Sequence, residues 1–162
     1  MTRWTAATAA LAVVLLTVGP AIRPPAALGH PTDDEPAGGR IDPDYAAGKA
    51  AIDAKNWPEA LRLLSSVALR DTRNADVQNY LGYAYRQSGQ LAPAFKHYRR
   101  ALELNPRHRG AHEYIGEAYL LANDLASAEQ HLAALEKICL IPCEEYEDLM
   151  KAVAEHRRRV AR

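Results

Sequence analysis

A repeat with a period of about 34 residues constrains the fold of this chain more than any other feature of its sequence. Three glycines are equally spaced at this period, and an alanine follows each of them at one constant interval. A repeat of this length indicates one supersecondary unit that is copied and stacked, because a single unit cannot bury its apolar face alone. The three glycine–alanine pairs are Gly48 with Ala60, Gly82 with Ala94, and Gly116 with Ala128.

The composition favours helices for these units. Ala and Leu carry most of the hydrophobic share of 48%, and the chain has a single Phe, which suits packed helices better than a β-sheet. Two helices approach closely only where the residues in contact are small, as glycine and alanine are. We therefore expect helices over residues 43–54, 58–69, 75–88, 91–104, 109–122 and 125–138.

The repeats resemble the tetratricopeptide repeat family, whose pattern is Leu-Gly, a Tyr, an Ala, an aromatic residue, a second Ala and a closing Pro. The second copy matches at Leu81, Gly82, Tyr85, Ala94, Tyr98, Ala101 and Pro106. The third matches at Ile115, Gly116, Tyr119, Ala128 and Leu132, and the first at Gly48 and Ala60. The resemblance implies an all-α fold of three helical hairpins, stacked as a short right-handed superhelix. The repeats would span residues 41–74, 75–108 and 109–142.

Residues 143–162 are expected to form a capping helix and a basic tail. Such a helix covers the apolar side of the last repeat, which no further repeat buries. Its apolar residues recur at helical spacing, at Tyr146, Leu149, Met150 and Val153. The chain closes on Arg157, Arg158, Arg159 and Arg162. These arginines suit the negative end of a helix dipole, and binding of an anionic surface is the alternative interpretation.

Residues 1–29 predict a signal peptide. Arg3 precedes an uncharged apolar stretch, Ala6–Val18, which is too short to cross a bilayer comfortably. Small residues follow it, so cleavage before His30 is expected, and an earlier site or an uncleaved membrane anchor are the alternatives. Residues 30–40, rich in Pro, Gly and acidic residues, predict a flexible linker. The protein is therefore expected to be exported, to the periplasm.

The only two cysteines, Cys139 and Cys143, lie at the expected turn between the last repeat and the capping helix. An even pair in an exported protein indicates a disulfide, which would pin the two helices together. A redox-active dithiol, a Cu(I) site and two free thiols are the alternatives. A redox dithiol usually has two residues between its cysteines rather than three, and acidic residues follow Cys143.

Six histidines raise the question of a metal site. His108 and His112 are four residues apart and could share a helix face, but His108 lies at a repeat boundary. His97 and His131 follow the glycine of their own repeat at the same interval, which places both on the outer helix of a hairpin. We expect packed or solvent-exposed histidines with no metal and no cofactor. Copper bound by a new N-terminus at His30 is the alternative.

The family resemblance also implies a binding surface, because the first helices of stacked repeats line a groove that holds an extended or helical peptide. The groove positions here are Tyr45, Lys49, Asp53, Asn79, Tyr83, Arg86, Gln87, Glu113 and Glu117, with Asp42, Ile52, Leu120 and Leu121 beside them. They imply a groove with a polar centre at Asn79, Tyr83 and Arg86 and an acidic end at Glu113 and Glu117. The acidic end disfavours a clamp for the terminal carboxylate of a partner.

The sequence contains no Ser/His/Asp order, phosphate-binding glycine loop, HExxH motif or convergent carboxylate pair, so we do not expect an enzyme. Twenty basic residues balance twenty acidic ones, which disfavours nucleic acid as a partner. We expect a non-catalytic adaptor or scaffold of the bacterial cell envelope, whose groove binds an unidentified protein or peptide. Membrane contact is expected only through an uncleaved signal segment. The alternatives are thiol redox or copper handling at Cys139 and Cys143, and self-association through the repeat edges.

Overall fold

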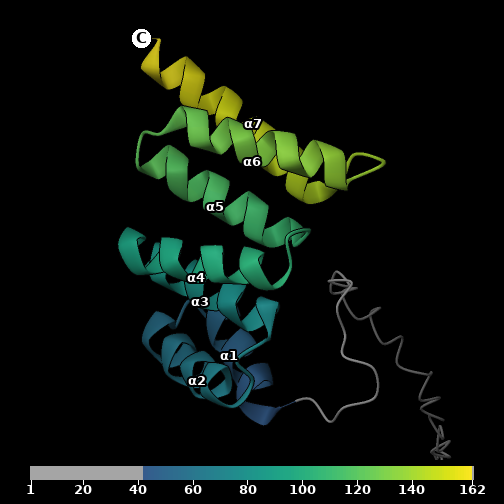
Figure 1. Ribbon diagram of the computed structural model, residues 1–162. Coiled ribbons are helices and arrows are strands. Elements are labelled where there is room, and N and C mark those ends of the chain that lie inside the picture. The colour runs from purple at the N-terminus through teal and green to yellow at the C-terminus, as the bar shows by residue number, and fades with distance from the viewer. Residues whose placement is uncertain (1–41, 162) are drawn as a thin grey trace, which may run out of the picture. The chain divides into compact units, whose positions relative to one another are not determined.

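The computed structural model describes residues 42–161, so the predicted signal peptide and linker lie outside the described residues. Residues 42–161 form seven α-helices and contain no strand. In chain order (Figure 1), the helices are α1 (Pro43–Asp53), α2 (Trp57–Arg70), α3 (Ala75–Gln87), α4 (Leu91–Leu104), α5 (Arg109–Leu121), α6 (Leu125–Ile138) and α7 (Glu144–Val160).

Each of the first six helices begins and ends within one residue of the range expected from the repeat pattern, which confirms the all-α prediction. These six helices pair as three hairpins, α1–α2, α3–α4 and α5–α6, and α7 packs on α5 and α6. No helix among residues 42–161 has both the length and the apolar character needed to cross a bilayer.

The turn inside each hairpin has the same backbone conformation in all three copies. Lys55, Gly89 and Asn123 occupy the same position of successive repeats and have φ angles of 55°, 77° and 60°. This left-handed conformation is without cost only for glycine, and asparagine tolerates it better than lysine does. The repeat therefore fixes a turn geometry that only the second copy meets with a glycine.

The first two repeat glycines lie where the helices of one hairpin come closest. A Cβ atom built on Gly48 would lie 2.8 Å from Leu64 of α2, and one on Gly82 would lie 2.5 Å from the Tyr98 ring of α4. The alanines of the pattern and Tyr98 have no exposed surface: Ala60, Ala94, Tyr98, Ala101 and Ala128. Tyr85 and Tyr119 are half-buried, and Pro106 is exposed just after α4.

The third glycine contacts the capping helix instead of its own hairpin. A Cβ atom on Gly116 would lie 2.6 Å from Leu149 of α7, a residue with no exposed surface. Val153 and His156 complete the buried face of α7, whereas Met150 is 41% exposed. The expectation that Met150 joins this face was wrong, because successive residues point about 100° apart around a helix and Leu149 already faces α5.

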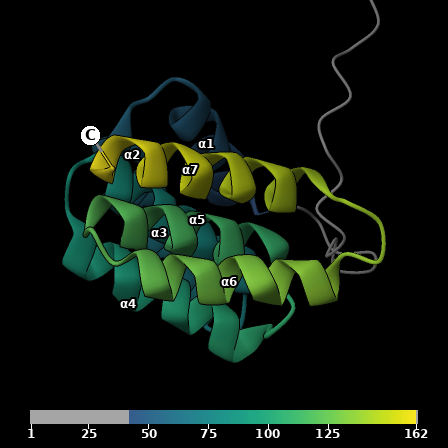
Figure 2. The same ribbon diagram turned by 90° about the horizontal axis from the view of Figure 1, so that it is seen from above.

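The first helix of each hairpin lies on the inner face of the array. Helix α3 contacts both α1 and α5, whereas α2, α4 and α6 make no contact with one another among the described residues. Successive hairpins therefore lie closer together along α1, α3 and α5 than along α2, α4 and α6, as the family resemblance implied. Figure 2, seen from above, shows α7 beside α5 and α6 at the end of the array.

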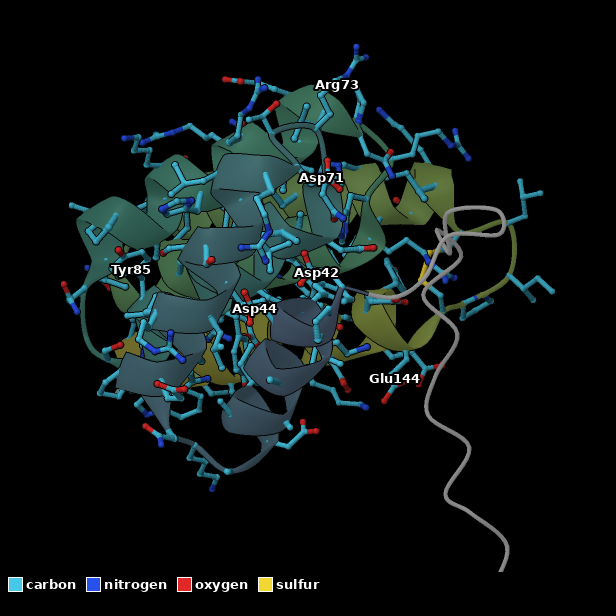
Figure 3. The ribbon with its side chains drawn as sticks, turned by 90° about the horizontal axis from the view of Figure 1, so that it is seen from below. Asp42, Asp44, Asp71, Arg73, Tyr85 and Glu144 are labelled. Atoms are coloured by element: carbon cyan, nitrogen blue, oxygen red, sulfur yellow. A yellow bond between two sulfur atoms is a disulfide. The ribbon has the colours of Figure 1, made fainter. Side chains whose placement is uncertain are left out.

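Ion pairs close the edge of the first hairpin. Arg70 at the end of α2 lies 2.9 Å from Asp42, which caps α1, and 2.8 Å from Asp44. The two aspartates lie next to each other in Figure 3. Because all three side chains are about a third or more exposed, these pairs contribute little to stability.

Candidate functional site

A hollow of about 400 Å³ opens on the inner face between α3, α5 and α7. We call it the inner hollow. Its lining combines apolar Leu120, Leu121 and Ala152 with polar or charged Arg86, Glu117, Glu155, His156 and Arg159. The structure therefore brings four of the predicted groove residues together at this hollow, and α7 supplies the other four lining residues.

Aromatic rings connect the first hairpin to the second and third along this face. The ring centre of Tyr83 lies 6.1 Å from that of Trp57 in α2 and 5.0 Å from that of Tyr114 in α5. Arg86 lies over both tyrosines, with its guanidinium carbon 5.3 Å and 5.5 Å from the two ring centres. Such cation–π contacts are stronger where the cation is partly desolvated.

Arg86 is engaged inside the protein rather than presented to a partner. Its side chain is only 10% exposed, and its Nη2 atom lies 2.7 Å from a carboxylate oxygen of Glu117. Its Nε atom also donates to the hydroxyl of Tyr98 at 3.3 Å. The prediction of Arg86 as an open polar contact therefore needs correction: it joins the second and third hairpins, and only its edge reaches the inner hollow.

Asn79, predicted at the polar centre of the groove, is 4% exposed. A Cβ atom on Gly110 would lie 3.2 Å from its Nδ2 atom, so the side chain sits between α3 and the start of α5. No donor among the described residues reaches its Oδ1 atom. A buried amide oxygen without a donor is unfavourable for folding.

Glu113 is 9% exposed, and the predicted acidic end of the groove is absent at this position. Burial raises the pKa of its carboxyl to about 8, and the nearby charges of Glu117, Glu145 and Asp148 add to the rise. Two of those charges belong to α7, whose Glu145 lies 3.5 Å from Arg109 of α5. Glu113 thus holds its proton more tightly than an exposed carboxyl does, which the sequence pattern did not reveal.

The remaining predicted groove residues lie on α1 and α3. Lys49 is exposed, and its Nζ atom lies 5.7 Å and 5.6 Å from the ring centres of Tyr45 and Tyr80. Asp53 at the end of α1 and Gln87 at the end of α3 are also exposed. These side chains are available to a ligand, in contrast to the buried positions of the second and third hairpins.

Two histidine contacts recur in successive hairpins, and sequence analysis missed them. Nδ1 of His97 lies 2.8 Å from Oε1 of Gln78, and Nδ1 of His131 lies 2.9 Å from Nδ1 of His112. Gln78 and His112 occupy equivalent positions of successive repeats. Each outer-helix histidine also stacks on a tyrosine of its own hairpin, at ring distances of 5.3 Å and 5.7 Å. The equal spacing of His97 and His131 was the signal that could have indicated this arrangement.

His108 and His112, which lie four residues apart, make separate contacts within the protein. His108 caps α5 by accepting from the backbone N–H of Ala111, and its Nε2 atom lies 2.9 Å from Asp76. His112 Nε2 donates to the carbonyl oxygen of Pro106 at 3.0 Å. No group of three or more histidine, cysteine or acidic side chains among residues 42–161 could hold a metal ion.

The structure joins Cys139, at the end of α6, to Cys143, at the start of α7, by a disulfide. The bond closes the turn 139–143 between these two helices. Leu140 and Ile141, which lie inside this turn, are 98% and 79% exposed.

The family model described as tetratricopeptide repeat matches residues 75–108. These residues form the hairpin α3–α4, and the hairpins before and after it repeat its glycine contact or its turn. Residues 75–108 therefore form a tetratricopeptide repeat. None of the curated protein sequences matches this chain.

Solved structures with the same fold come from distant sequences. The chaperone SycD of the type III secretion translocator from Yersinia enterocolitica has a TM-score of 0.66 and 15% identity, over 74% of this chain and 84% of that one. The TPR2B domain of yeast Sti1, in complex with pHsp70, has a TM-score of 0.67 and 16% identity, over 72% and 94%. PcrH in complex with the chaperone-binding region of PopD has a TM-score of 0.62 and 19% identity, over 73% of this chain and 89% of that one. At these identities the likeness shows the fold, a helical-repeat solenoid.

Proposed function

We propose that this protein is a non-catalytic adaptor or scaffold whose inner face binds a segment of a partner protein. The inner hollow is the observation that carries the proposal, because three successive layers, α3, α5 and α7, contribute to it. Ligand sites combine apolar side chains with polar groups that orient the ligand, and both kinds line this hollow. Leu120 and Leu121 favour an apolar side chain of the partner, and the charged residues beside them favour polar groups next to it.

Exposed charges on α1 favour a charged segment as the rest of the ligand. Lys49 and Asp53 are exposed on α1, so they can contact charged side chains of the partner. This supports a partner segment of mixed charge with at least one large apolar residue.

Two of the similar solved structures lend analogy to this proposal. SycD from Yersinia enterocolitica is solved with a peptide of the translocator YopD, and PcrH is solved with the chaperone-binding region of PopD. By analogy, a partner segment would run along α1, α3 and α5.

We place this adaptor in the bacterial cell envelope, exported to the periplasm. The support is the apolar N-terminal segment with its positive start, together with the Cys139–Cys143 disulfide. Disulfides persist in oxidising compartments and are rare in the cytosol. Fractionation of the native cells should recover the protein in the periplasm without residues 1–29, and recovery from the cytosol would contradict this location.

A displayed library of random peptides tests the binding function. Panning against the purified protein should enrich peptides with a shared apolar residue, and Lys49→Glu and Leu121→Asp should each weaken their binding about tenfold or more, equivalent to about 1.4 kcal/mol. Lys96→Glu, an exposed lysine of the outer helix α4, is the matched control and should bind like the native protein. Equal affinities for all three variants would show that the inner face is not the binding surface.

The alternative of thiol redox or copper handling has less support around the disulfide. Cys143 directly precedes α7, whose first turn carries Glu144, Glu145 and Glu147. Their negative charge disfavours the thiolate that both chemistries need. We therefore propose a structural bond, and protein purified without reductant should contain no free thiol and resist a glutathione buffer. Ready reduction, or uptake of Cu(I), would favour the alternative.

A further inference from the structure

The turn 139–143 presents apolar side chains in a closed loop. Leu140 is 98% exposed and Ile141 is 79% exposed, and the Cys139–Cys143 disulfide closes the loop around them. Because the bond and the two flanking helices restrict the loop, it loses little conformational freedom when it docks. Two adjacent aliphatic side chains at this exposure favour a contact that buries them.

The inner hollow lies at the opposite end of α7. Helix α7 has 17 residues, which corresponds to about 25 Å, and its second half, from Ala152 to Arg159, lines the hollow. Figures 1 and 2 both show the turn that joins α6 to α7 at one end of α7 and the C-terminus at the other. The loop therefore cannot reach the hollow of its own chain.

The lining of the hollow suits such a loop. Leu120, Leu121 and Ala152 are its apolar lining residues, and Leu121 is 61% exposed. The volume of about 400 Å³ leaves room for a few side chains. Exposed aliphatic surface is thus present at both ends of α7, as a projection at one end and as part of a hollow at the other.

The two ends of α7 also carry opposite charge. Its first turn holds Glu144, Glu145 and Glu147, and its last turn holds Arg157, Arg158 and Arg159. Among residues 42–161, Arg157 is paired with Glu129, whereas Arg158 and Arg159 have no carboxylate within ion-pair distance. The basic end of α7 therefore has charge available for an acidic partner surface.

We infer that the inner hollow of one copy receives the disulfide-closed loop of a second copy, so that this protein associates head to tail. Leu140 and Ile141 would contact Leu121 and the apolar residues beside it, while the acidic start of α7 would face the basic end of α7 in the next copy. Since the two surfaces differ, each contact leaves one loop and one hollow open, and chains of copies grow instead of closed dimers.

This inference uses the hollow of the proposed function, so a second copy and a partner peptide would compete for it. The contact is small, and interfaces below about 1,200 Å² are typically transient. We therefore expect association that rises with protein concentration and weakens at high salt, because exposed charges are screened.

Sedimentation of the purified protein over a range of concentrations tests the inference. The weight-average mass should rise above that of one chain at high concentration and return toward it in concentrated salt. The double variant Leu140→Ser/Ile141→Ser and the variant Leu121→Asp should each stay monomeric while keeping the native helical content. Leu69→Asp is the matched control, since Leu69 is an exposed leucine on α2, 83% exposed and outside both surfaces.

A mixture of the two monomeric variants decides the head-to-tail geometry. The loop variant keeps an intact hollow and the Leu121→Asp variant keeps an intact loop, so an equimolar mixture should form dimers that grow no further. A monomeric native protein, a monomeric mixture or an equal effect of Leu69→Asp would overturn the inference. Peptide binding separates the two proposals: the loop variant should still bind the enriched peptides, and Lys49→Glu should still self-associate.

Discussion

At Gly82, one added methyl group would lie 2.5 Å from two ring carbons of Tyr98. This ring has no exposed surface, and its hydroxyl accepts a hydrogen bond from Arg86, so the ring cannot move aside at low cost. Gly89 is the opposite case, since its φ of 77° requires a left-handed conformation but nothing lies within 4 Å of a Cβ atom there. The two glycines are therefore needed for different physical reasons, close packing and backbone conformation.

Gly82→Ala should lower the free energy of unfolding by about 1–3 kcal/mol or more, the usual cost of inserting atoms into a packed core. Gly89→Ala should cost about 1 kcal/mol, the cost of a left-handed conformation for a residue with a Cβ atom. Urea unfolding of both variants measures the difference. If Gly82→Ala leaves the free energy of unfolding unchanged, the hairpin helices can separate at this contact.

Glu113 should make stability depend on pH. Its pKa is raised to about 8 in the folded protein, so the fold retains a proton that the unfolded chain releases near pH 4.5. The contribution of Glu113 to the free energy of unfolding is fully present below pH 4.5, falls as the pH rises toward 8 and is lost above 8. Glu113→Gln should therefore be more stable than the native protein at about pH 9 and closest to it near pH 4.5. Unfolding midpoints of the variant and the native protein at the two pH values test this. The same difference between the two proteins at both pH values would contradict it.

At the scale of elements, the hairpins α3–α4 and α5–α6 differ in the polar contact between their helices. In α5–α6 two imidazoles face each other, His112 with His131, where the preceding hairpin has Gln78 with His97. Burial lowers the pKa of His131 to about 4, and the neighbouring His112 adds to this effect. Burial is also the largest cause that lowers the pKa of His112. Burial also lowers the pKa of His97 in α3–α4, but that hairpin has one such imidazole, so α5–α6 should be the more acid-sensitive of the two.

The histidine pair should lose stability in acid. The pKa of His131 is lower in the folded protein than in the unfolded chain. The contribution of the pair to the free energy of unfolding is therefore fully present above pH 6.5 and is lost as the pH falls toward 4. His112→Gln copies the contact of the second hairpin and should make the loss smaller. The measurement is the difference in urea midpoint between variant and native protein at neutral pH and near pH 4.5, which cancels the contribution of Glu113. If the difference in urea midpoint is the same at both pH values, the histidine pair is not the cause of the loss of stability in acid.

For the array of hairpins, the capping helix supplies both stability and part of the binding surface. Leu149 contacts Gly116 and has no exposed surface, and the second half of α7 lines the inner hollow. An end repeat without such a helix would expose the apolar side of α5 and α6 to water. Loss of α7 packing should thus affect folding and partner binding together.

Leu149→Ala should lower the free energy of unfolding by about 2–5 kcal/mol, as expected for a leucine removed from a core. Met150→Ala is the neighbouring control, and at 41% exposure it should cost about 0.5 kcal/mol or less. Leu149→Ala should also weaken binding of the enriched peptides, because α7 forms one wall of the hollow. Thermal unfolding and peptide titration measure the two effects, and equal stabilities of the two variants would contradict the packing of α7 described above.

The repeat period was sufficient to place the six hairpin helices within one residue, because helix ends, hairpin turns and glycine contacts are local and recur in each copy. Lys49, Asp53 and Gln87, which the repeat register predicts as groove residues, are exposed on α1 and α3. Register alone could not show that Arg86 is held by Glu117 and Tyr98, since those contacts depend on the distance between layers.

The amino-acid order alone thus specifies a stack of helical hairpins with a closing helix, since periodic burial requires no knowledge of distant contacts. Which groove positions stay accessible follows from how α7 and the neighbouring hairpins meet in space. Glu113 illustrates this: its repeat position predicts an exposed carboxylate, but the fold buries it, and this burial, with the charges of Glu117 and of two acidic residues of α7, raises its pKa. Burial of a side chain depends on every element around it, whereas helix formation depends mainly on its own neighbours along the chain.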